Sequence, residues 1–266
     1  MDLGEPGPVY IEIPTDVLRT SVKKSLIPND WMISKPMRKL CPDPELIEQA
    51  AHLVRQSNRP LVITGRGGKN ARHELTRFLD TIDAVYLDTQ ESRGLIDRNN
   101  KAFVGAMRAA AMNGADLVIT VGRKLDYQMG FGSPAVFPEA KFLRLADTTG
   151  ELIDNRRGDV EVLADVKTSL DALSDALKMN AGNRDSCWLD DLREKHLKRI
   201  QKGAAWMNDN VGPDGKIHPM AIFDAIAQVA TDDYIAVADG GDLLSFARIG
   251  LEADTYLDAG VFGCLG

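Results

Sequence analysis

The chain has 266 residues, long enough for one large domain or a medium one with flanking pieces, and its composition, 44% hydrophobic and 27% charged, is that of a soluble globular protein. Its net charge of −7 argues against a nucleic-acid partner, and no run of about 20 apolar residues predicts a membrane span. The three cysteines have no metal-ligand or disulfide spacing and the N-terminus lacks a signal-peptide pattern, so we expect a cytoplasmic protein.

The first segment has the pattern of a β-strand. Residues 7–16 (GPVYIEIPTD) alternate apolar and polar side chains and then reach a proline. A lone strand cannot bury its apolar side chains stably, so we expect residues 1–16 to close a sheet whose other strands lie upstream. Residues 17–43 are predicted to be a linker, because their prolines break any long helix.

Residues 44–180 alternate strands and helices, which predicts a Rossmann-like central domain. Asp43 is expected to cap the first helix, with Pro44 at its first position. Strands are predicted at 60–64, 84–87, 115–121, 140–145 and 160–163, and helices at 71–82, 106–113 and 167–179. Because helices separate the strands, the fold class is predicted to be α/β with a doubly wound parallel sheet, flanked by partial α/β domains.

The rest of the chain is predicted to be a helical linker and the start of another domain. Residues 181–215 contain a charged helix that we expect at the surface between domains. Residues 216–266 contain a helix, an apolar strand near Ile235 that we expect to be buried, and two glycine-rich turns. Because the last residues are apolar and follow a glycine turn, we expect the chain to stop inside a binding site.

Three residues at predicted strand ends are candidates for nucleotide binding. Gly67 lies in the turn 65–68, which is either a loose phosphate-loop signal or a tight turn that enters a helix. Arg123 and Asp147 follow two other strands, at the edge where open parallel sheets bind ligands. A paired cation and carboxylate would grip a phosphate and a ribose; the alternative is that both are ordinary loop charges. The four histidines are interpreted as structural.

The order of these segments resembles thiamine-diphosphate enzymes of the acetolactate synthase type. Residues 7–16 are similar to the end of that family's pyrimidine-binding domain, and residues 60–68 and 115–123 to its central domain. The turn DGGD at 239–242 and the sequence LDAGVFGCLG at 257–266 are similar to the opening of its diphosphate-binding domain. The resemblance covers nearly the whole chain and depends most on its first and last motifs.

The resemblance implies a fragment of a carboligase or lyase that acts on 2-keto acids and uses thiamine diphosphate and Mg²⁺ to stabilise a carbanion. The implied cofactor contacts are Gly241, Asp242, Leu243, Gly263 and Leu265. The activating glutamate is expected upstream of Met1 and the magnesium motif beyond Gly266, so we expect no catalytic or metal residue here and no turnover by this chain alone. Sites between subunits imply a homodimer or homotetramer.

Three alternatives stay open at this point. FAD is a further candidate ligand for Gly67, Arg123 and Asp147, although the sequence after Gly122 departs from the Arg-Phe-Asp usual at that FAD site. A 2-hydroxyacyl-CoA lyase or oxalyl-CoA decarboxylase is the near alternative, since residues 257–263 resemble their version of the turn; the substrate would then be an acyl-CoA. A non-catalytic nucleotide-binding module over residues 40–180 is the third.

Overall fold

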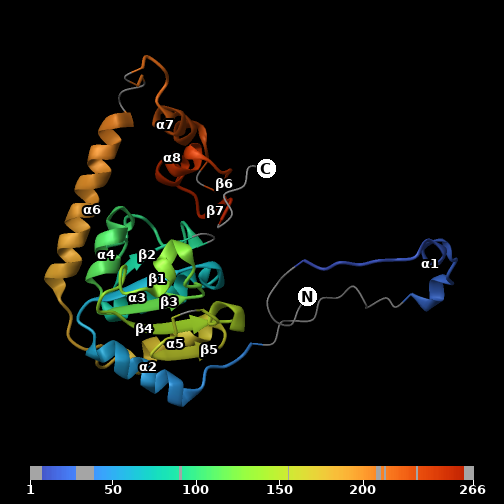
Figure 1. Cartoon of the computed structure of the whole chain (residues 1–266), viewed down its shortest axis with the longest axis horizontal. Coiled ribbons are helices and arrows are strands. Elements are labelled where there is room, and N and C mark those ends of the chain that lie inside the picture. Colours follow the sequence, from blue (N-terminus) through green and yellow to red (C-terminus); the bar gives the residue numbers. More distant parts are fainter. Residues whose placement is uncertain are drawn as a thin grey trace. The chain divides into compact units, whose positions relative to one another are not determined.

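A computed structural model describes residues 8–27, 39–89, 92–154, 156–207, 211–212, 214–231 and 233–260. The chain forms two compact units, Met1–Leu40 and Cys41–Gly266, each described here by itself (Figure 1). The finer division at residues 180 and 215 stays a prediction. No helix within the described ranges is long and apolar enough to cross a membrane.

The first unit contains short helical segments instead of the expected strand. Helix α1 spans Thr15–Arg19, and a 3₁₀ turn, η1, spans Lys24–Leu26. Residues 8–13 form no strand, and Tyr10 is 85% exposed. The strand predicted at 7–16 is therefore wrong over its described part, because no neighbouring strand supplies hydrogen-bond partners there.

The second unit is built around a five-stranded sheet in which every pair of neighbours is parallel. In spatial order the strands are β2 (Val85–Leu87), β1 (Pro60–Thr64), β3 (Leu117–Val121), β4 (Lys141–Ala146) and β5 (Val160–Leu163). All five strands lie where the sequence predicts them. The α/β fold class and the doubly wound parallel sheet are confirmed.

Helices cover both faces of this sheet (Figure 1). One face packs on α2 (Pro44–Gln56), α3 (Arg72–Ile82) and α5 (Val166–Leu177). The other packs on α4 (Arg108–Gly114) and α6 (Ser186–Met207). Because both faces are covered, every residue of β1 and β3 is buried, which explains their unbroken apolar sequences. The Asp43 cap is confirmed, since its Oδ1 accepts a hydrogen bond from the Glu45 amide at 2.9 Å.

Helix α6 packs on the central region and is more than a surface linker. Its Leu192 and His196 side chains are buried, whereas Lys195 and Lys198 face solvent. The His196 ring contacts Phe103 edge-on, with ring centroids 5.5 Å apart. This environment fits the structural role predicted for that histidine.

The C-terminal segment, residues 211–260, contains α7 (Pro219–Val229), β6 (Ile235–Ala238), α8 (Asp242–Gly250) and β7 (Thr255–Asp258). Strands β6 and β7 form a separate two-stranded parallel sheet. Strand β6 lies where predicted, but the expected burial is wrong: Ile235 and Val237 are 63% and 73% exposed. In the described structure β6 pairs only with β7, and α7 and α8 cover one face of the pair. Strand β7 was missed, because its residues were assigned to a glycine-rich turn.

Candidate functional site

The order of the strands creates a switch point at the centre of the sheet. The chain places β2 on one side of β1 and β3 on the other, so the carboxyl ends of β1 and β3 flank the crevice where open α/β sheets bind ligands. Gly67 follows β1, Arg123 follows β3 and Asp147 follows β4. The structure therefore brings the three predicted residues to one edge of the sheet.

Two glycine loops meet at this switch point. A Cβ atom on Gly67 would lie 2.8 Å from the Gly122 Cα and 3.2 Å from Asp147 Oδ1. Only a residue without a side chain fits at Gly67, and Gly122 has a φ of +56°, which also favours glycine. The close contact of the loops places Asp147 directly beside Gly67.

The glycine loop after β1 does not offer its amides to a phosphate. The Gly65 and Gly67 amides donate to the carbonyl oxygens of Val121 and Gly122, each at 3.1 Å, and the Gly68 amide donates to Gly65 O at 3.0 Å. These three donors already have backbone acceptors, which favours the alternative stated from the sequence, while an anion at the first amides of α3 stays a prediction. The alternative, a tight turn before α3, describes the loop correctly.

Asp147 is held by an arginine that sequence reasoning did not single out. Arg66 Nη2 lies 2.8 Å from Asp147 Oδ1 and 2.9 Å from Glu151 Oε1. Burial alone would lower the pKa of Arg66, but the charges of Glu151 and Asp147 raise it. The Asp147 side chain keeps 37% exposure, so a ligand at this edge can reach it.

Arg123 pairs with a different carboxylate from the one expected. Its guanidinium is 2% exposed and donates to the two Asp126 oxygens at 2.8 and 2.9 Å. It also donates to Lys124 O at 2.7 Å and to Gln128 Oε1 at 3.2 Å. Arg123 and Asp147 border the same edge, and their joint role in binding a nucleotide stays a prediction.

Arg108 lies close enough to Arg123 and Arg93 to feel their charges, and sequence reasoning missed both Arg108 and Arg93. Burial, together with the charges of Arg123 and Arg93, lowers the pKa of Arg108 to about 10. Burial raises the pKa of Asp88, while Arg93, Arg98 and Arg108 oppose that shift. One sequence feature could have pointed to these charged residues: Asp88 directly follows β2, at the same carboxyl edge of the sheet as Arg123.

Comparison with known proteins identifies this architecture. Residues 47–173 match the family described as thiamine pyrophosphate enzyme, central domain. The central region of the chain, residues 47–173, therefore belongs to this family of central domains. It is 28% identical over 278 residues to a 2-hydroxyacyl-CoA lyase from Arabidopsis thaliana, covering 99% of this chain and 48% of that protein. It is 26% identical over 276 residues to the oxalyl-CoA decarboxylase of Escherichia coli K12, with the same two coverages, 99% and 48%.

The chain thus spans about half the length of the curated relatives it matches. The crystal structure of benzoylformate decarboxylase from Polynucleobacter necessarius shares the fold, with a TM-score of 0.63 at 16% identity. That match covers 90% of this chain and 44% of the other.

The predicted cofactor turn forms the N-terminus of α8. Gly241 has a φ of +79°, and no atom of the described residues lies within 4 Å of the place where a Cβ would be. Asp239 Oδ1 accepts a hydrogen bond from the Gly240 amide at 2.7 Å, and Leu243 is 57% exposed. Open backbone at a helix N-terminus fits a diphosphate. Gly263 and Leu265, the other predicted contacts, lie outside the described residues.

Arg98 connects the C-terminal segment to the central region of the chain. Arg98 donates to the carbonyl oxygens of Arg248, Ile249 and Leu251 at 3.1, 3.0 and 3.0 Å, at the C-terminus of α8. The pairing of a cation with these free carbonyls complements the negative end of the helix.

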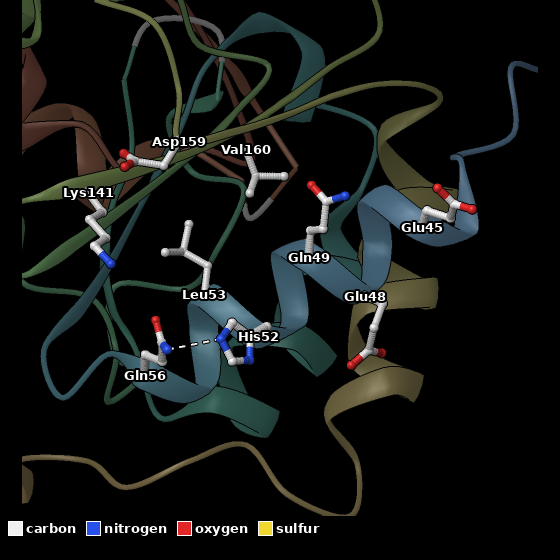
Figure 2. Close-up of a pocket in the computed structure, with 9 residues that line it drawn as sticks. All are labelled: Glu45, Glu48, Gln49, His52, Leu53, Gln56, Lys141, Asp159 and Val160. Carbon is white, nitrogen blue, oxygen red and sulfur yellow. Dashed lines mark hydrogen bonds between the residues drawn. The ribbon is translucent and has the colours of Figure 1, made fainter.

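A hollow of about 680 Å³ lies on the opposite edge of the sheet, away from the switch point. Figure 2 shows Gln49, His52 and Gln56 of α2 on one side of it, and Lys141 and Asp159, near the amino ends of β4 and β5, on another. His52 Nε2 and Gln56 Nε2, one helical turn apart on α2, lie within hydrogen-bond distance at 2.9 Å. No metal-binding group of side chains occurs in the described ranges, here or elsewhere.

Proposed function

We propose that this chain is part of a thiamine-diphosphate-dependent lyase or decarboxylase whose substrate is an acyl-CoA. Its relatives over 99% of the chain include 2-hydroxyacyl-CoA lyases from two plants and an oxalyl-CoA decarboxylase. These relatives favour the 2-hydroxyacyl-CoA lyase or oxalyl-CoA decarboxylase alternative over the acetolactate synthase type. A homodimer or homotetramer and a requirement for Mg²⁺ remain part of the proposal.

Residues 240–243 would hold the diphosphate of the cofactor. The open side of Gly241 lets a bulky anion reach the backbone, and the first amides of α8 point toward it. When bound, thiamine diphosphate supplies the electron sink for the carbanion next to the former carbonyl. The role of this chain is to hold and orient that group.

The central domain would bind the nucleotide portion of the acyl-CoA. The observation that carries this assignment is the switch-point edge, where Asp147 stays partly exposed beside the Gly67–Gly122 contact. A carboxylate there can accept hydrogen bonds from ribose hydroxyls, while Arg66 fixes its orientation. FAD is the competing ligand for the same edge.

Titration calorimetry of the 266-residue chain with coenzyme A, ADP and FAD tests this assignment. Binding is the better readout than turnover, because the relatives are about twice as long. We expect coenzyme A and ADP to bind, and Asp147→Asn to weaken both by roughly 10-fold, the value of one charge-assisted hydrogen bond. Asp80→Asn, at an exposed position on α3, is the matched control and should bind like the wild type.

Binding of FAD and binding of an acyl-CoA predict opposite orders of affinity in this experiment. Tighter binding of FAD than of coenzyme A, with yellow flavin retained on the purified protein, would reject the acyl-CoA assignment. Equal affinities of Asp147→Asn and Asp80→Asn for ADP would remove Asp147 from the site.

A further inference from the structure

Residues 92–98, the docking segment, follow β2 and are fixed to the core of the central region. Ser92 is fully buried, and its Oγ accepts a hydrogen bond from Thr64 Oγ1, at the end of β1, at 2.8 Å. Leu95 and Ile96 are buried in the apolar cluster on one face of the sheet. These contacts hold the docking segment in place without help from the C-terminal segment.

Helix α6 holds the other end of the docking segment. Arg193 of α6 donates to the carbonyl oxygens of Arg98 and Asn99 at 3.2 and 3.1 Å, and to that of Phe103 at 2.7 Å. A guanidinium bound to three carbonyl oxygens fixes the path of the chain, because each of these hydrogen bonds is charge-assisted. The side chains that contact the C-terminal segment therefore project from a rigid backbone.

Arg98 holds the C-terminus of α8. Its four acceptors in the C-terminal segment are the three carbonyl oxygens described above and Glu252 Oε1, which lies 3.2 Å from its Nη1. The last carbonyl groups of a helix have no partner within the helix, so a side chain that binds three neighbouring ones fixes the position of that helix end.

Gly94 brings the two backbones into direct contact. Its φ is +75°, and a Cβ atom there would lie 2.0 Å from the Ala253 carbonyl oxygen, so only glycine fits. Arg72 of α3 adds a clamp over the same place, since it donates to Gly94 O at 3.0 Å and lies 2.9 Å from Asp254 Oδ1. The loop between α8 and β7 is thus held at one position on the docking segment.

Arg93 extends the contact to β7. Asp258 Oδ2 lies 2.7 Å from Arg248 Nη2 of α8 and 3.7 Å from Arg93 Nε, and the Asp258 side chain is buried. Among the described residues, the apolar cluster of the C-terminal segment shares no member with the two clusters of the central region. The contacts at the docking segment are polar and directional, which favours one orientation of the C-terminal segment.

We propose that the docking segment positions α8, and with it residues 240–243, relative to the central region, with Arg98 as the main positioning residue. Helix α8 has nine residues and is about 14 Å long, so fixing its C-terminus sets the direction in which its first amides point. The consequence for the cofactor rests on the proposed function, in which those amides hold the diphosphate. The docking itself does not.

Two measurements without ligand test this role on the full chain. In a chain whose cysteines are replaced by serine, spin labels at Asp80→Cys on α3 and Ser245→Cys on α8 report the distance between two exposed positions. We expect one narrow distance distribution, and a broader one when Arg98→Met is added. Hydrogen exchange should show the protection of α8 lowered at least about 10-fold in Arg98→Met, the loss of one charge-assisted hydrogen bond, with β1 and β3 unchanged.

Arg157→Met, which removes a 76% exposed arginine of the central region, is the matched control and should keep the wild-type distances and protection. Unchanged distances and α8 protection in Arg98→Met would overturn the proposal. An equal loss of protection over α8, β1 and β3 would also overturn it, because that pattern marks a general loss of stability. If Arg98→Met does not fold, Arg98→Lys keeps the charge but loses the fork: weaker α8 protection then supports the role, and wild-type protection overturns it.

The docking and the proposed function can fail separately, because neither measurement uses a ligand. A chain whose α8 depends on Arg98 but which binds neither coenzyme A nor ADP would support the docking and contradict the proposed function. Normal ADP binding together with an α8 that ignores Arg98→Met would do the reverse.

Discussion

The central sheet and the C-terminal strand pair use similar apolar sequences with opposite results. In β3 (LVITV) every residue is buried, whereas in β6 (IAVA) Ile235 and Val237 are exposed. The difference lies in the surroundings, since β3 has strands on both sides and helices on both faces. An apolar run therefore predicts a strand, while its burial is decided by neighbours that the run itself does not specify.

The largest expected effect on stability comes from a comparison of two Arg–Asp pairs, one in each region. Arg144 is fully buried and lies 2.5 Å from Asp154, whereas Arg248, bound to Asp258, is 28% exposed. Asp154→Asn leaves a buried arginine uncompensated and should lower the free energy of unfolding by about 3–5 kcal/mol. Asp258→Asn should cost only about 1–3 kcal/mol, because Arg248 can reach water. Urea unfolding measures both, and equal losses would contradict the comparison.

A second test applies one substitution to both regions. Ile119→Ala in β3 removes a side chain with 0% exposure and should cost about 2–5 kcal/mol, the range for truncating a buried aliphatic residue. Ile235→Ala in β6 removes one that is 63% exposed and should change stability by less than about 0.5 kcal/mol. Denaturant titrations provide both values. A large loss at Ile235 would mean that its side chain is covered in solution.

Most of the central fold could be predicted from the sequence. Buried strands in an α/β domain are continuous apolar runs separated by amphipathic helices, so local pattern and tertiary structure agree. The segment 7–16 shows the limit, since alternation predicts a strand only where partner strands are present. Strand β7 was missed because Thr255–Asp258 is short and Tyr256 is its one fully buried residue.

The sequence predicted where the candidate site lies, but not which carboxylate each of its arginines contacts. Strand ends identified Gly67, Arg123 and Asp147 as neighbours of one crevice. Which carboxylate each arginine contacts depends on side-chain geometry across loops, so Arg123 pairs with Asp126 and Asp147 with Arg66. The approach of Arg108 to this edge was likewise invisible in the sequence, because it follows from the packing of α4 against the loop at Met129.

The smallest expected effect concerns His196, which belongs to the well-covered region. Burial lowers the pKa of His196 to about 4, and the charges of Arg193 and Arg98 contribute. Its Nδ1 accepts a hydrogen bond from the Ala106 amide at 3.1 Å, which requires the neutral ring. Since the unfolded chain binds this proton near pH 6.5, folding stability should fall as the pH drops from about 6.5 to about 4 and then level off.

His196→Asn keeps an acceptor near the Ala106 amide but does not titrate. The wild type should therefore lose on the order of 2–3 kcal/mol relative to this variant between pH 7 and pH 4, at about 1.4 kcal/mol per pKa unit. Subtracting the two urea-unfolding curves at each pH removes the contribution of carboxylates that titrate in both proteins. His218, which caps α7 through its Nδ1, provides the comparison from the C-terminal segment. If His218→Asn abolished the pH dependence and His196→Asn did not, the buried imidazole of α6 would not be its source.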